Sequence, residues 1–173
     1  MSQYPLIAGG QKITTTLLNA MMPVDLYKTA NTTRASTTTF TNDPDLTVNL
    51  DASATYSVEM HLFYAAIDAE RLKTQWATPA SSTGFRTCVG PDQGQILSSG
   101  TSGGQGRWGV HNFNTACTYG NRNSGTLLCY ALERGLVTTT SSGTLALQWT
   151  QATSGTTGAL LSAGTYMRVK RIA

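Results

Sequence analysis

Charged side chains are scarce in this sequence. Aspartate, glutamate, lysine and arginine make up 12% of the 173 residues, and the formal net charge is +3. Globular proteins carry about twice that share. The basic residues are dispersed, and no basic run is longer than the pair at 170–171. Because binding to nucleic acid needs clustered positive charge, the sequence predicts no nucleic-acid partner.

Long apolar segments are absent as well. No stretch approaches the roughly eighteen consecutive apolar residues that cross a bilayer, so we expect no membrane partner. The first eight residues lack the basic and apolar regions of a secretory signal. We therefore expect synthesis in a cytosol, with any exit from the cell by another route.

Cysteine is rare and irregularly spaced. Cys88, Cys117 and Cys129 form an odd set, and neither a Cys-x-x-Cys nor a His-x-x-x-His spacing occurs. At most one disulfide can form within the chain, and buried, reduced thiols are expected. Without a recognisable ligand spacing, the sequence predicts no metal site and no cofactor.

A catalytic constellation is also missing. His61 and His111 are fifty residues apart, and a histidine on a strand is most often a hydrogen-bonded surface residue. Glu59 and Glu70 are the pair that a glycosidase would use, but we interpret them as solvated charges at turns and edges. Residues 100–104 match the letters of a nucleophile elbow, yet no strand precedes them and no helix follows, so we interpret them as loop. The sequence predicts no enzyme.

The sequence is rich in threonine, glycine and short alternating apolar runs. Threonine suits a half-exposed pleated surface and glycine suits turns, so the composition favours a mainly β fold. Apolar and polar side chains alternate in residues 46–50, 55–64, 143–151 and 166–171, as in strands with one buried face. We place Trp149 in the core because it is in register with Leu145 and Leu147.

Turn signals divide these runs into expected hairpins. The Asn-Asp-Pro-Asp sequence at 42–45 predicts a turn, residues 46–64 a hairpin, and residues 143–171 a closing hairpin with a Ser/Gly/Thr connection. Residues 133–135 are interpreted as a kink or bulge between two strands. About eight strands at this spacing predict a single jelly-roll-like β-sandwich over residues 28–173.

The N-terminal residues 1–27 are expected to form an arm with a short amphipathic helix at 11–22. Its apolar side chains recur near helical spacing, and Pro23 ends the segment. The apolar stripe either packs on the edge of its own domain or attaches the chain to a neighbouring subunit. Its candidate anchor residues are Ile13, Leu17, Leu18 and Met21.

One aromatic residue is a candidate for surface recognition. Trp108 lies in a glycine-rich region, beside Arg107 and near Asn112. Carbohydrate-binding sandwiches use exposed Trp and Tyr platforms, so a sugar-binding module is the alternative to a purely structural protein; burial of Trp108 is the alternative to both.

Several segments, taken in order, resemble structural proteins of tailed bacteriophages that infect actinobacteria. The N-terminal part of the resemblance comprises residues 10–11, 13–14, 17–18, Lys28 and 33–38. It continues with Asp-Pro-x-Leu at 43–46, Ala-x-Tyr at 54–56, the strand 143–151 and Ala-Gly-Thr-Tyr at 163–166. Each motif is only a turn-and-strand pattern, and their order along one chain carries the resemblance. Residues 80–125 lie outside it.

The resemblance implies a virion structural protein, either a minor tail protein or an accessory protein that decorates the head. Phage sandwiches of this kind resemble jelly rolls of the tumour-necrosis-factor and C1q type, so a homotrimer is implied. The arm would attach it to other virion proteins of the capsid or tail. The loops would face outward, where a host-surface glycan is a candidate ligand. The protein would then reside in the virion after synthesis in the host cytoplasm.

Overall fold

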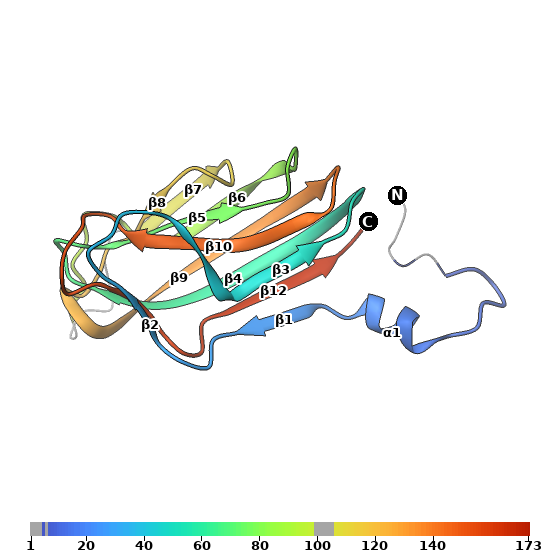
Figure 1. The fold of residues 1–173 in the computed structure, drawn as a ribbon, viewed down its shortest axis with the longest axis horizontal. Helices are drawn as coiled ribbons and strands as arrows, with labels where there is room; N and C mark the ends of the chain where they lie inside the picture. Colours follow the sequence, from blue (N-terminus) through green and yellow to red (C-terminus); the bar gives the residue numbers. More distant parts are fainter. Residues whose placement is uncertain (1–4, 6, 99–105) are drawn as a thin grey trace.

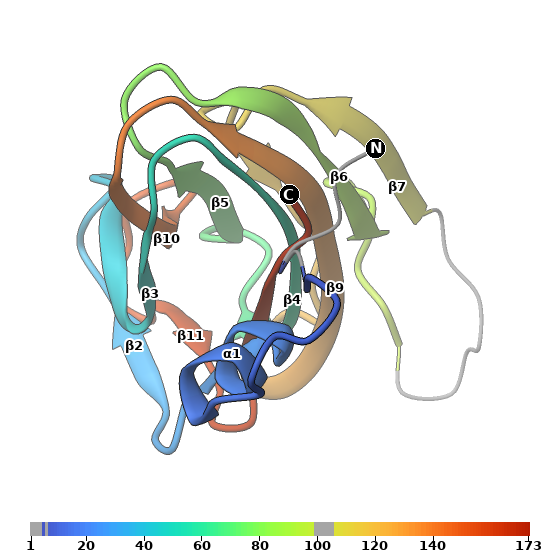
Figure 2. The same ribbon diagram turned by 90° about the vertical axis from the view of Figure 1, so that its right-hand side faces the viewer.

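Two antiparallel sheets face each other across a single apolar core. The chain is described here by a computed structural model, which covers residue 5 and residues 7–98 and 106–173. Figure 2 looks along the sandwich, with β3, β10 and β5 on one side and β4, β9 and β6 on the other. The mainly β sandwich predicted from the sequence is confirmed, although the described residues form twelve strands and not about eight.

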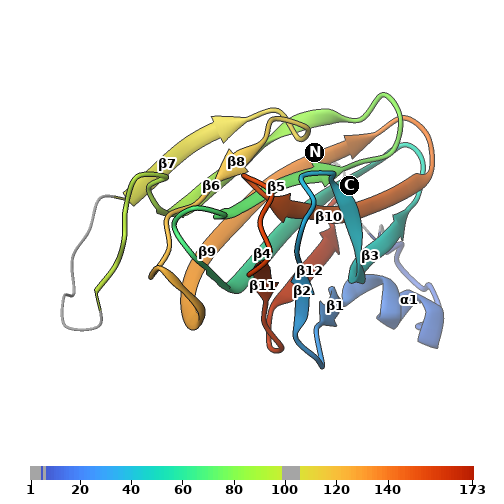
Figure 3. The same ribbon diagram turned by 60° about the vertical axis from the view of Figure 1, so that its left-hand side comes forward.

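The larger sheet has eight strands and the smaller has four. In the larger sheet the order is β1-β12-β4-β9-β6-β7, and β11 pairs with both β4 and β2. These strands are β1 (Val24–Tyr27), β2 (Thr32–Arg34), β4 (Ala54–Ala66), β6 (Thr83–Pro91), β7 (Gly106–His111), β9 (Ser124–Thr139), β11 (Ala159–Leu161) and β12 (Tyr166–Arg171). The smaller sheet, in the order β3-β10-β5-β8, contains β3 (Thr41–Leu50), β10 (Gly143–Gln151), β5 (Leu72–Ala77) and β8 (Cys117–Thr118). In Figure 1 β10 and β5 of the smaller sheet lie in front of β9 and β4 of the larger sheet, and Figure 3 shows the same strands from another side.

The alternating runs form the core, as predicted. Along β4 every second residue from Tyr56 to Tyr64 is apolar and at most 6% exposed, and the residues between them, which include Phe63, point outward. Trp149 is fully buried, in register with Leu145 and Leu147. Met167 and Val169 are buried on β12, whereas Arg168 and Lys170 are exposed.

Both predicted hairpins are wrong. β3 pairs with β10 and β4 pairs with β9 and β12, so residues 46–64 are divided between the two sheets. Likewise β10 lies in the smaller sheet while β11 and β12 lie in the larger one. Alternation identifies which face of a strand is buried but not its partner. A connection as short as residues 51–53 can still cross the roughly 10 Å between packed sheets, since an extended residue spans about 3.3 Å.

The kink expected at residues 133–135 is absent. β9 runs unbroken from Ser124 to Thr139 and pairs with β4 on one side and β6 on the other. Glu133, which suggested an interruption in the apolar pattern, faces inward and is fully buried. The charge is tolerated because partners from other strands satisfy it, as described below.

The prediction of a turn at 42–45 is also wrong. The chain does not reverse direction there, because these residues lie inside β3. The register between β3 and β10 shifts opposite residues 43–46, which therefore leave the ladder. Asp43 Oδ1 accepts a hydrogen bond from the backbone N of Asp45 at 3.1 Å. The Asp-Pro signal thus produces an irregularity within a strand instead of a turn between strands.

Asp43 is a buried partner for groups on other strands. Lys28, fully buried just after β1, places its Nζ 2.9 Å from Asp43 Oδ2 and 2.8 Å from Asp45 Oδ2. Trp149 Nε1 donates to the same Asp43 carboxylate at 2.9 Å. These contacts connect the end of β1 to the opposite sheet. Four residues of the expected arm, Val24–Tyr27, thus form β1 and pair with β12.

The N-terminal helix is shorter than the expected 11–22. α1 spans Thr15–Met21, with Thr14 as its N-cap accepting from the backbone N of Leu17. The helix begins after Thr14, which is in an extended conformation and whose side chain caps one of the first helical N–H groups, that of Leu17. Within the described residues, no helix is both long and apolar enough to cross a bilayer.

Gly84 is a position where only glycine fits. Its φ is +129°, and a Cβ built there would lie 2.0 Å from the backbone oxygen of Leu136 on β9. We expect Gly84→Ala to lower the free energy of unfolding by at least about 2 kcal/mol, through backbone strain and separation of β6 from β9. Gly94→Ala is the matched control, because a Cβ added at Gly94 would have no other atom within 4 Å. Equal denaturation midpoints for the two variants would contradict this interpretation.

Candidate functional site

The outer face of the eight-stranded sheet, which points away from the smaller sheet, carries a row of aromatic and apolar side chains. Strand pairing aligns one residue from each of six strands, in the order Trp108, Val89, Leu132, His61, Tyr166 and Tyr27. Trp108 is 76% exposed and Tyr27 is 65% exposed. We call these six residues the aromatic row. It crosses the face from β7 to β1 at right angles to the strands.

Further apolar side chains flank the aromatic row on the same face. Phe85, Val110, Leu128, Tyr130 and Leu136 are between 41% and 67% exposed. Phe85 and Leu136 are cross-strand partners and line a shallow hollow of about 600 Å³. Contiguous apolar surface of this kind on a soluble domain marks an interaction site.

Two arginines on this face are paired with carboxylates on the same face. Arg134 Nε lies 2.6 Å from Glu59 Oε2, and Arg168 Nε lies 2.7 Å from Asp25 Oδ1. The hydrogen bond to His61 lowers the pKa of Glu59, and Arg134 adds to the effect. Both pairs are exposed and contribute little to stability, but they reduce the net charge of the face.

His61 is hydrogen-bonded on the surface, as expected. Its ring stacks on Tyr166 with centroids 4.4 Å apart, Nδ1 is 2.8 Å from the Tyr130 hydroxyl, and Nε2 is 2.5 Å from Glu59.

Glu70, in contrast, is not the solvated carboxylate that was expected. It is 5% exposed and accepts hydrogen bonds from Gln151 Nε2 and the backbone N of Gly158. Glu59 and Glu70 therefore do not face each other as a glycosidase pair.

The structure does not bring Trp108, Arg107 and Asn112 into one site. Trp108 is on the outer face, whereas Arg107 is half-buried and donates to the backbone oxygen of Thr118 at 2.6 Å. Asn112 is exposed just beyond β7 and lines a separate polar cavity of about 470 Å³. Gln75 and Gln148 also line this cavity.

The candidate anchor residues, of which Ile13 precedes α1 and the other three lie in it, are largely exposed. Ile13 is 64%, Leu18 51% and Met21 45% exposed, and Leu17 is half-buried. No residue of the helix is buried. In Figure 1 α1 lies beyond β1, outside the layers of the sandwich. The chain's own domain thus leaves this apolar stripe uncovered. Residues 100–104, the predicted loop, lie outside the described residues.

A buried ionic network joins the two sheets. Glu133 on β9 forms an ion pair with Arg86 on β6, and both are fully buried. Three other groups donate to the Glu133 carboxylate: Thr74 Oγ1 at 2.5 Å, Trp76 Nε1 at 2.6 Å and the Tyr119 hydroxyl at 2.8 Å. Burial lowers the pKa of Arg86, but the Glu133 carboxylate, together with smaller contributions from Cys88, Cys117 and Tyr119, raises it by more, so the net shift of the guanidinium's pKa is upward.

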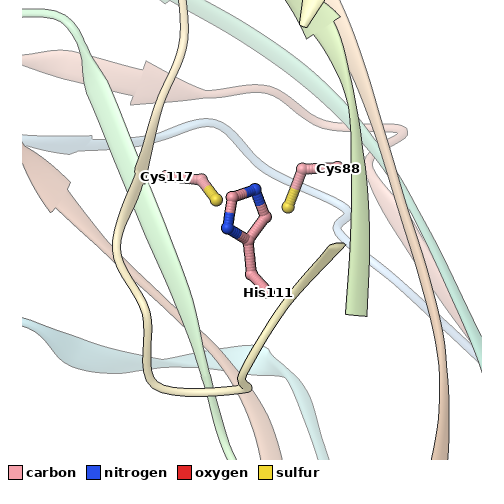
Figure 4. A group of neighbouring side chains, drawn as sticks. All are labelled: Cys88, His111 and Cys117. Carbon is pink, nitrogen blue, oxygen red and sulfur yellow. The ribbon is translucent and has the colours of Figure 1, made fainter. Parts of the chain in front are cut away.

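Cys88, His111 and Cys117 come together beside this network. Figure 4 shows the imidazole of His111 between the two sulfur atoms. One ligand atom from each residue lies within 4.8 Å of the others, which makes this the one group of metal-ligand type found among the described residues. Both thiols are free and fully buried, as expected for the cysteines, and His111 is half-buried.

Two of the three groups, His111 and Cys117, have pKa values shifted toward the form that coordinates metals, whereas that of Cys88 is shifted away from it. Burial lowers the pKa of His111, and the positive charges of Arg86 and Arg107 lower it further. The hydrogen bond between the thiols lowers the pKa of Cys117 to about 7 and raises that of Cys88. Neutral imidazole and thiolate are the forms that coordinate metals.

Spacing alone gave no indication of this cluster. Its members come from β6, β7 and β8, with twenty-two and five residues between them. Zinc-type motifs place ligands in close pairs, and this set has none. The sequence gives only a coarser sign of the cluster: two of the three cysteines and one of the two histidines fall within residues 88–117.

No protein-family model matches the sequence, and no curated protein matches it either. The structural neighbours include the tripod from the baseplate of bacteriophage Tuc2009, with 10% identity, a TM-score of 0.39, and coverage of 96% of this chain and 72% of that one. Another is the VP2 subviral particle of infectious bursal disease virus, with 11% identity, a TM-score of 0.23, and coverage of 88% of this chain and 37% of that one. Scores in this range carry no argument about function.

Proposed function

We propose that this chain is a non-enzymatic structural protein of a bacteriophage particle, an accessory protein at the surface of the tail or head. It self-associates through the outer face of the eight-stranded sheet and docks onto the particle through α1. The observation that carries the proposal is the extensive exposed apolar surface of that face, centred on the aromatic row. The ordered motifs that resemble phage structural proteins give the biological setting.

A second copy of the chain is the occupant that this face suits best. Identical chains bring like charges together, so a strongly charged face would oppose self-association. Here Arg134 and Arg168 are neutralised by Glu59 and Asp25 on the same face. Exposed Trp and Tyr side chains are the residues that supply most of the energy at protein interfaces. We favour a trimer because the resemblance to tumour-necrosis-factor-type jelly rolls implies one.

The exposed stripe on α1 is the docking element for another virion protein. Deletion of residues 1–22 should leave a folded domain, because the deletion ends before β1 and removes no buried residue of α1. We expect the truncated chain to melt like the full chain but to be missing from assembled particles, as measured by mass spectrometry of purified virions. Normal incorporation would rule out the anchor.

Point variants of α1 test whether docking depends on the apolar stripe or only on the presence of the helix. Leu18→Asp with Met21→Asp places two charges on the apolar side of α1 and should prevent incorporation. Thr16→Asp with Asn19→Asp adds the same charge on the opposite side and should not, because these positions are outside the stripe.

Carbohydrate binding at the host surface is the second candidate function. The polar cavity lined by Asn112, Gln75 and Gln148 offers amide groups of the kind that bind sugar hydroxyls, and Trp108 offers an exposed ring on the outer face. A glycan array with the wild-type protein tests for binding. Loss of signal in Asn112→Ala places the sugar in the cavity, loss in Trp108→Ala places it on the outer face, and no wild-type signal rejects this function.

A further inference from the structure

We propose that Cys88, His111 and Cys117 bind one Zn²⁺ ion, which joins the two sheets at their open edge. The proposal rests on the geometry of the cluster and is independent of the proposed function. Two thiolates and one imidazole supply three of the four ligands that zinc takes in tetrahedral sites, and a solvent molecule supplies the fourth.

The distances allow coordination with small side-chain adjustments. Zinc lies about 2.3 Å from thiolate sulfur and about 2.0 Å from imidazole nitrogen, so tetrahedral ligand atoms are about 3.5–3.8 Å apart. The three ligand atoms of the cluster already lie within 4.8 Å of one another. Closing the remaining gap of about 1 Å is within the reach of Cys and His rotamers.

His111 supplies an independent observation. Its Nε2 is buried and has no hydrogen-bond partner among the described residues. A buried imidazole nitrogen without a partner costs free energy, and native structures normally satisfy such groups. A metal ion between the thiols would give the ring the ligand bond that the protein itself does not provide.

The location explains what the ion would do. β7 is the last strand of the larger sheet, and β8 is the last strand of the smaller one. β8 has two residues and, among the strands of the described residues, pairs with β5 alone. With Cys88 and His111 on one sheet and Cys117 on the other, an ion bound by all three fixes the edge strands across the core.

The electrostatic surroundings tolerate the ion. Two thiolates neutralise Zn²⁺, and the nearby Arg86 is already paired with Glu133. Arg107, the other cation acting on His111, donates to the backbone oxygen of Thr118. Binding releases the remaining thiol protons to solvent, so affinity falls as the pH is lowered.

The test is metal titration of the full-length protein, purified under reducing conditions and stripped with a chelator. We expect one equivalent of Zn²⁺ per chain, a rise in Tm on the order of 5–10 °C, and a thiolate-to-cobalt absorption band when Co²⁺ replaces zinc. Cys117→Ser and His111→Ala should each abolish the band and the rise in Tm.

Cys129→Ser is the matched control, because Cys129 is also buried and reduced but lies outside the cluster. It should bind zinc like the wild type. His111→Ala keeps both thiols in the core, so it remains informative if the cysteine variants fail to fold. Absence of zinc binding by the reduced wild type, or unchanged binding by His111→Ala, would overturn the proposal. A disulfide between Cys88 and Cys117 in protein prepared anaerobically would do the same.

Discussion

Glu133→Gln is expected to lower the free energy of unfolding by about 3–5 kcal/mol, the typical cost of removing one partner from a buried ion pair. The substitution keeps the size and shape of the side chain but leaves the Arg86 guanidinium without its counter-ion in the core. It also weakens the hydrogen bonds from Trp76 and Tyr119, whose donors face the carboxylate. Equilibrium denaturation measures the loss.

Arg134→Ala is the matched control, one residue further along β9. Arg134 also forms an ion pair, with Glu59, but its side chain is 57% exposed and the pair is solvated. We expect this variant to cost no more than about 1 kcal/mol. Similar losses in the two variants would show that Glu133 does not hold the sheets together.

A double variant, Arg86→Met with Glu133→Leu, should be more stable than Glu133→Gln because it leaves no unpaired charge.

The fold class could be predicted from the sequence because strand alternation is a local signal. Tyr56 to Tyr64 and Leu145 to Trp149 showed which side chains would be buried, and they are. The partners of those strands could not be predicted, because β3 and β10 are almost a hundred residues apart and alternation is the same for any partner. Short connections suggested hairpins, but here they cross between sheets.

Buried polar groups were the hardest to predict. Glu70, Asp43 and Glu133 looked like surface charges because an isolated carboxylate belongs in water. Each is buried because donors from distant segments surround it, including Lys28 for Asp43 and Arg86 for Glu133. The aromatic row was missed for the same reason, since its six members become neighbours only through strand register.

The second large effect is expected at the outer face. Trp108→Lys combined with Leu136→Lys should weaken self-association at least about 100-fold, because aromatic and apolar side chains buried in an interface are each worth about 2 kcal/mol or more. Both side chains are exposed in the isolated chain, at 76% and 52%, so folding should be unaffected. Sedimentation over a range of concentrations measures the change in dissociation constant.

A control with the same added charge tests whether the position matters. Asn49→Lys with Ser154→Lys introduces two lysines at exposed positions, one in the smaller sheet and one in the connection between β10 and β11, away from the outer face. Self-association should be unchanged. If both double variants weaken association equally, the effect is one of net charge and the outer face is not the interface.

The most direct test of the central claim is the mass of the purified wild-type protein in solution. Sedimentation equilibrium at tens of micromolar should give about three times the 18.4 kDa of one chain. The Trp108→Lys, Leu136→Lys variant should sediment as a single chain under the same conditions. A wild-type protein that stays a monomer throughout that range would contradict self-association through the outer face.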